Sequence, residues 1–152
     1  MKIQGIIALI FMMIAANLFA LPKGSCIPGA YLVQEQSGAW SIWTISKDGT
    51  AQFSSSAQSA FHFSDAHGAW RQVRSREAKA TLLDFNFGPT PAPDSIARVD
   101  ATFSFSKNCR TLTGNFDLRF FDIGSEDPLD VNSDSGDPIK DTFTGRRITS
   151  AK

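Results

Sequence analysis

The chain has 152 residues, and its 15 basic side chains balance its 15 acidic ones, so its formal net charge is zero. This balance argues against nucleic acid or an anionic membrane surface as the partner, because both attract strongly basic proteins. The hydrophobic share of 42%, with 13 phenylalanines and three tryptophans, is enough for the core of one folded domain.

The first element is an apolar run close to the N-terminus. Lys2 precedes residues 6–19, which are apolar except for Asn17. A run of about fourteen residues is short for a helix that must cross ~30 Å of hydrocarbon. A basic start, a short apolar run and a small residue such as Ala20 at its end are typical of a cleavable signal peptide. We therefore predict a signal peptide over residues 1–20 and one secreted or periplasmic domain over residues 21–152, with no integral membrane segment after cleavage. An uncleaved anchor is the alternative.

The exported part holds two cysteines, Cys26 and Cys109. An even number of cysteines in an oxidising compartment predicts a disulfide. This bond would close a loop of about 83 residues and contribute roughly 4 kcal/mol in the chain-entropy model.

The rest of the chain alternates with a period of two. Val99, Ala101, Phe103 and Phe105 share one face of a segment whose other face is polar, as half-buried strands require. Similar patterns predict eight strands, at 30–36, 40–46, 50–56, 69–74, 78–87, 97–106, 111–121 and 140–149. The apolar face of segment 78–87 changes after Leu82, which predicts a bulge there.

The connections between these strands favour one topology. If consecutive strands alternate in direction, the long loops 57–68, 88–96 and 122–139 all emerge at one end. Both cysteines then lie at the opposite end, where they can bond. The prediction is an all-β domain, a single antiparallel up-and-down β-barrel of eight strands, with a sandwich as the alternative.

Several short motifs carry a resemblance to known proteins. They are Gly-Ala-Trp at 38–40 and again at 68–70, Asp48-Gly49-Thr50, Asp84-Phe85-Asn86-Phe87, Asp127-Pro128-Leu129 and Phe143-Thr144-Gly145-Arg146. Together they resemble a loose group of small secreted bacterial proteins of uncharacterised function, which implies no activity. The first Gly-Ala-Trp is also similar to the Gly-x-Trp that opens the lipocalin barrel. That resemblance implies that Arg146 or Arg147 packs on Trp40.

Two segments hold candidate metal ligands. His62, Asp65 and His67 are side chains of the types that bind zinc, but no spacing makes them converge, and ordinary loop histidines are the better explanation. Asp130, Asn132 and Asp134 stand at alternate positions of an acidic stretch, and Asp141 follows at the twelfth place. This spacing is similar to that of an EF-hand or dockerin loop and predicts a calcium site, the only cofactor suggested; a solvated loop is the alternative.

No nucleophile motif is present, because no serine stands in Gly-x-Ser-x-Gly. Asp84 and Asp100 are placed so that their carboxylates could face each other across two neighbouring strands. A buried acid there would have a raised pKa and could act as a base; exposure of both on the polar strand face is the alternative.

The aromatic side chains point to binding instead. Barrels of eight strands either fill their interior or leave room for one small ligand. We expect Trp40, Phe103 and Phe116 to line such a pocket. The function expected is that of an exported, non-enzymatic binding or interaction protein. Its partner is a small apolar ligand or a protein held by the long loops. The alternative is a small barrel enzyme of the isomerase or cyclase type acting on an apolar substrate.

Overall fold

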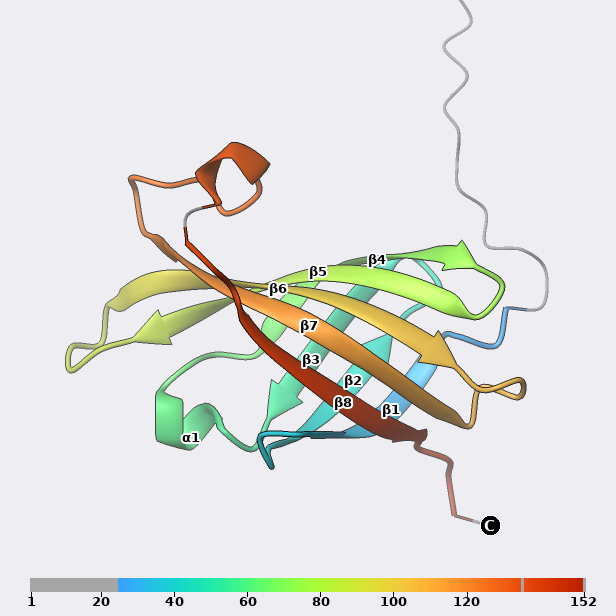
Figure 1. Ribbon diagram of the computed structural model, residues 1–152. Helices are drawn as coiled ribbons and strands as arrows, with labels where there is room; N and C mark the ends of the chain where they lie inside the picture. The colour runs from blue at the N-terminus through green and yellow to red at the C-terminus, as the bar shows by residue number, and fades with distance from the viewer. Residues whose placement is uncertain (1–24, 135, 152) are drawn as a thin grey trace, which may run out of the picture.

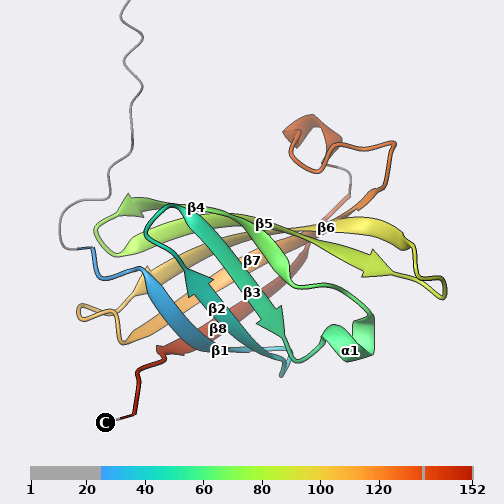
Figure 2. The same ribbon diagram turned by 180° about the vertical axis from the view of Figure 1, so that it is seen from behind.

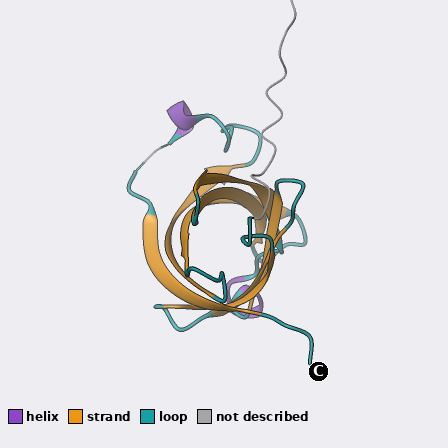
Figure 3. Ribbon diagram, turned by 90° about the vertical axis from the view of Figure 1, so that its right-hand side faces the viewer, coloured by secondary structure: helices purple, strands orange, loops and turns teal. Residues whose placement is uncertain are grey.

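Residues 25–134 and 136–151 are described by a computed structural model. The signal peptide predicted over residues 1–20 lies outside them. Eight strands form one closed barrel, in which each strand pairs antiparallel with the next and the last strand pairs with the first (Figure 1; Figure 3). The predicted up-and-down barrel is therefore confirmed.

The strands are close to those predicted from the alternation. They are β1 (Gly29–Glu35), β2 (Trp40–Ile45), β3 (Thr50–Ser55), β4 (Ala66–Arg74), β5 (Glu77–Phe87), β6 (Pro93–Phe105), β7 (Thr111–Asp122) and β8 (Ile139–Arg147). A short helix, α1 (Gln58–Phe61), follows β3, and a 3-10 turn, η1 (Val131–Ser133), precedes β8. Within the described ranges, no helix has the length and apolar character needed to cross a membrane.

The two ends of the barrel differ, as the loop lengths predicted. The connections after β3, β5 and β7, at 56–65, 88–92 and 123–138, emerge together at the left of Figure 1, which we call the open end. The turns after β2, β4 and β6, at 46–49, 75–76 and 106–110, lie at the other end, the closed end, which is at the left of Figure 2. The N-terminal segment before β1 also lies there.

The half of the barrel near the closed end is filled by aromatic side chains. The rings of Trp43 and Phe53 stack with their centroids 4.7 Å apart. Phe103, only 1% exposed, meets Trp43 edge-on at 5.0 Å and lies 5.4 Å from Phe143. The inward face predicted for β6 is therefore confirmed, and this half is a packed core.

The pairing of β5 contradicts the bulge predicted after Leu82. No bulge occurs at Leu82, because β5 pairs with β6 in continuous register from Glu77 to Asn86. Leu82 and Asp84 therefore both point inward, and the apolar Phe85 is left on the outer surface. The predicted bulge was wrong because it assumed that every apolar side chain of this strand must be inside.

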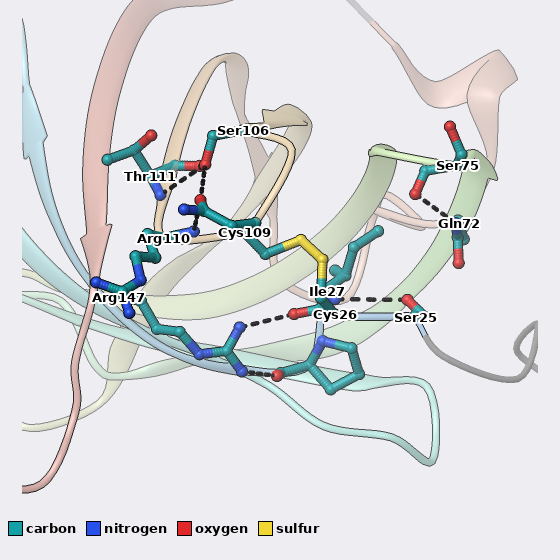
Figure 4. The surroundings of a disulfide bond; sticks show 12 residues. Ser25, Cys26, Ile27, Gln72, Ser75, Ser106, Cys109, Arg110, Thr111 and Arg147 are labelled. Carbon is teal, nitrogen blue, oxygen red and sulfur yellow. Dashed lines mark hydrogen bonds between the residues drawn. A yellow bond between two sulfur atoms is a disulfide. The ribbon is translucent and has the colours of Figure 1, made fainter.

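A disulfide and an arginine cover the closed end. Cys26 and Cys109 are bonded, with their Cα atoms 5.8 Å apart, as predicted from the topology (Figure 4). The Arg147 guanidinium donates to the carbonyl oxygens of Cys26, at 2.7 Å, and Pro28. It also donates to the Tyr31 hydroxyl at 3.0 Å and lies over the Tyr31 ring. Gly29 has a φ of +157°, which other residues rarely adopt, and a Cβ atom there would displace this guanidinium, so the position favours glycine.

The role of Arg147 differs from the one that the lipocalin resemblance implied. Arg147 packs on Tyr31 and not on Trp40, since Trp40 begins β2 at the opposite end of the barrel. Arg146 has the opposite parity on β8 and is exposed. The prediction that either arginine packs on Trp40 was therefore wrong.

Candidate functional site

A cavity of about 970 Å³ occupies the half of the barrel toward the open end. Its floor is formed by Trp43, Phe53 and Val99, which are all buried. Its rim includes Phe61 and Ile139, which are exposed. A buried apolar floor and an exposed rim place the mouth among the loops of the open end. The volume is typical of sites that hold one small organic molecule.

The cavity forms because the inward side chains change along the strands. Near the closed end these side chains are all apolar: aromatic rings, aliphatic chains such as those of Ile45 and Leu112, and alanines. Toward the open end, polar residues occupy the inward positions of several strands, namely Glu35, Ser55, Asp84 and Asn86. Phe116 stands at the boundary, with its ring centroid 6.3 Å from that of Phe143. The packed core ends at this level and the barrel is hollow above it.

Asp84 is the buried polar group of this cavity. The residue is 5% exposed, and Ala97, its partner on β6, is too small to cover the carboxyl group. The Asn86 amide nitrogen lies 3.4 Å from one of the Asp84 carboxylate oxygens. Burial raises the pKa of Asp84 to about 6. Among the described residues, no lysine, arginine or histidine forms an ion pair with it.

Two other carboxylates line the mouth, and both hold the turn between β1 and β2. The Ser41 hydroxyl donates to Glu35 at 2.6 Å, and the Ser37 backbone N–H donates to Asp141 at 3.1 Å. Burial raises the pKa of Asp141, but the hydrogen bonds from Ser37 and Thr142 outweigh it and hold this pKa below its ordinary value. These two carboxylates already have partners within the protein.

The structure places the three residues expected to line a pocket in three different environments. Phe116 lines the cavity, whereas Phe103 lies below it in the packed core. Trp40 is 43% exposed on the outer face of β2 and does not line the cavity. Trp43, three residues later, lines it instead. Alternation did not reveal this, because Trp40 and Ile42 make the outer face of β2 as apolar as its inner face.

The two Gly-Ala-Trp motifs are not structurally equivalent. Trp70 points inward near the closed end, and its indole N–H donates to the Ser46 carbonyl oxygen at 2.7 Å. Trp40, in contrast, points outward. The repeat therefore does not mark two copies of one site.

Asp84 and Asp100 do not form a pair of catalytic carboxylates. Asp84 faces the cavity, whereas Asp100 is on the outer face, where it accepts from Thr81 at 2.6 Å and from Arg98 at 2.7 Å. The predicted pairing was wrong because the two positions have opposite parity in the paired strands.

The acidic loop is fastened to the outside of the barrel by an arginine that the sequence did not single out. Arg98, 5% exposed, donates to Asp134 at 2.6 Å and to the Pro128 carbonyl oxygen at 2.7 Å, and it lies over the Phe121 ring. Arg119 lies 3.4 Å from the other Asp134 oxygen. Asp134 is therefore the main anchor of this loop.

The structure does not bring the four predicted calcium ligands together. Asp130 accepts from the backbone N–H of Asn132 at 2.9 Å at the start of η1, and Asp134 is in ion pairs. Asp141 lies at the mouth of the cavity with Ser37. Within residues 25–134 and 136–151, no three histidine, cysteine or acidic side chains are grouped so that they could hold a metal ion.

The three suggested zinc ligands, all among the described residues, are not grouped into a metal site either. Asp65 accepts from the Gln58 amide at 2.9 Å. His67 is exposed on β4, and His62 follows α1 in a left-handed conformation.

We expect Asp134→Asn to lower the free energy of unfolding by about 1–2 kcal/mol, because it removes a carboxylate from the nearly buried Arg98. Urea unfolding measures this change, and Asp137→Asn, in the same loop, is the control. An equal effect of both variants would mean that loss of acidic charge, and not the ion pair, is responsible. The same samples melted with and without millimolar calcium test the predicted calcium site.

Comparisons of the chain with protein-family models, with curated proteins and with solved structures find no match. The resemblances to lipocalins and to small secreted bacterial proteins therefore gain no support from them.

Proposed function

We propose that this chain is an exported binding protein that holds one small apolar ligand in the cavity at the open end of its barrel. The observation that carries this proposal is the cavity of about 970 Å³ with its aromatic floor. The Cys26–Cys109 disulfide supports export, because such bonds persist in oxidising compartments.

The energetics of the cavity favour such a ligand. Trp43, Phe53 and Phe116 present flat apolar surfaces at the base of a space large enough for an alkyl chain or ring. Each methylene group moved from water into such surroundings contributes about 0.8 kcal/mol. The floor is already built by the core below it, so little side-chain ordering opposes binding.

A matched pair of variants tests the site. N-phenyl-1-naphthylamine, a neutral apolar fluorophore, is expected to bind with increased fluorescence. Ser55→Trp narrows the cavity and is expected to weaken binding by about tenfold or more. Ser54→Trp, one residue away on the outer face of β3, is expected to leave the affinity unchanged.

Native mass spectrometry of the purified protein adds a second readout, the mass of any ligand that is carried along. A fluorophore that fails to bind, or that binds equally to both variants, would overturn the proposal. Recognition of a protein partner through the long loops would then be the better account.

Asp84 favours a second candidate function, a small barrel enzyme acting on an apolar substrate. A carboxyl group with a pKa of about 6, buried in an apolar cavity, is suited to accept and return a proton near neutral pH. Conversion of a bound ligand that stops in Asp84→Asn would support catalysis. Recovery of that ligand chemically unchanged would count against it.

A further inference from the structure

The lining of the cavity carries an excess of negative charge. Three carboxylates line it, those of Glu35, Asp84 and Asp141, whereas Lys140 is the one basic residue among the described lining residues. Two of the carboxylates accept hydrogen bonds that fasten the turn between β1 and β2. Asp84 is different, because it is nearly fully buried and has no basic partner in the described chain.

The surroundings of Asp84 leave room for an external group. Leu82, the inward residue before it on β5, belongs to the core, so Asp84 stands where the cavity begins. Across β6 its neighbour is Ala97, and beyond Ala97 on β7 stands Phe120 at the rim. The carboxyl group therefore faces open space between a small side chain and aromatic rings.

We propose that the ligand is an amphiphile with a protonated amine, whose ammonium group binds the Asp84 carboxylate while its apolar part lies on the floor of Trp43, Phe53 and Phe116. This proposal rests on the proposed function. The one side-chain donor near Asp84 in the described chain is the Asn86 amide, at 3.4 Å. An ammonium group supplies further N–H donors and the positive charge that Asp84 lacks, and such charge-assisted hydrogen bonds are about twice as strong as neutral ones. The aromatic rings add cation–π attraction.

The same electrostatics oppose the other common classes of amphiphile. A fatty acid would bring a carboxylate into a cavity that already holds three, and like charges that are close together in a space shielded from water repel strongly. An alcohol could donate one hydrogen bond to Asp84 but would leave its charge uncompensated. The order of affinity expected is amine, then alcohol, then carboxylate.

Three ligands of one chain length test this order. Decylamine, decanol and decanoate compete at neutral pH with N-phenyl-1-naphthylamine bound to the mature protein, the two ionic ligands below their micellar concentrations and decanol below its solubility limit. Decylamine is expected to bind at least about tenfold more tightly than decanol, and decanoate more weakly than either. Asp84→Asn is expected to abolish the preference for the amine and to leave the affinity for decanol within about twofold.

Two further variants complete the design. Asp117→Asn removes the same charge from the outer face of β7 and is expected to keep the preference. Asp84→Glu retains the carboxylate and should keep a preference for the amine even if Asp84→Asn proves hard to fold.

The outcomes separate this proposal from the one on which it rests. Failure of the fluorophore and of all three ligands would overturn the proposed function itself. Equal binding of amine and alcohol, tighter binding of decanoate, or a preference that survives Asp84→Asn would overturn the amine proposal and leave apolar binding intact.

Discussion

Phe103→Asp is expected to abolish folding. Phe103 is 1% exposed, and its ring contacts those of Trp43, Phe105 and Phe143 in the packed half of the barrel. An aspartate there would lose these contacts and bury a charge that has no partner in the cluster. Together these effects exceed about 5 kcal/mol, a large part of the stability of a domain of this size. Loss of the near-ultraviolet circular dichroism of the tryptophans measures the result.

Thr102→Asp is the matched control. Thr102 is the preceding residue of β6 and points outward, opposite Lys79 of β5, which would offer an introduced carboxylate a favourable cross-strand neighbour. This variant is expected to fold with a free energy of unfolding within about 0.5 kcal/mol of that of the parent protein. Similar behaviour of the two variants would contradict the assignment of the inner face.

The contrast between β6 and β2 shows which parts of the fold could be predicted from the sequence. On β6 one face is apolar and the other polar, so a period of two identifies the inner face directly. On β2 both faces are apolar, and Ser41 is buried while Trp40 is exposed. Hydrophobicity alone cannot identify the inner face of such a strand. For this reason Trp40 was predicted to line the pocket, whereas Trp43 lines it in the structure.

The polar lining of the cavity was not predicted, for a related reason. Expecting apolar side chains inside made Leu83 and Phe85 the inward residues and Asp84 an outward one. A hollow barrel admits polar residues on its inner face, because they border a space and not a packed core. The sequence signal for a polar inner face was Asp84, which stands between two apolar side chains. The unbroken pairing of β5 with β6 shows that Asp84 points inward.

The acidic loop illustrates what a local motif leaves out. The alternation of Asp130, Asn132 and Asp134 describes the loop alone, whereas Arg98, which binds Asp134, is 36 residues away in the sequence. On β6 this arginine resembled any other member of a polar face. The disulfide, in contrast, was predictable, because its position depends only on the number and direction of the strands.

Asp84→Asn is expected to stabilise the protein at neutral pH. Because burial raises the pKa of Asp84 from 3.8 to about 6, the folded protein holds its proton more tightly than the unfolded chain does. The contribution of Asp84 to stability is therefore fully present below about pH 4 and is lost as the pH rises through about 6. Asparagine stays neutral and avoids this loss, which amounts to at most about 3 kcal/mol.

Urea unfolding of both proteins between about pH 4 and pH 8 tests this expectation. The two free energies of unfolding should agree at the acid end and diverge in favour of the variant as the pH passes 6, whereas Asp117→Asn should follow the parent protein throughout. A variant less stable than the parent at neutral pH would show that the carboxylate makes structural bonds and is not left free for a ligand. A variant that is more stable yet loses its preference for decylamine would show that the buried charge opposes folding and serves binding, the trade-off expected of a functional site.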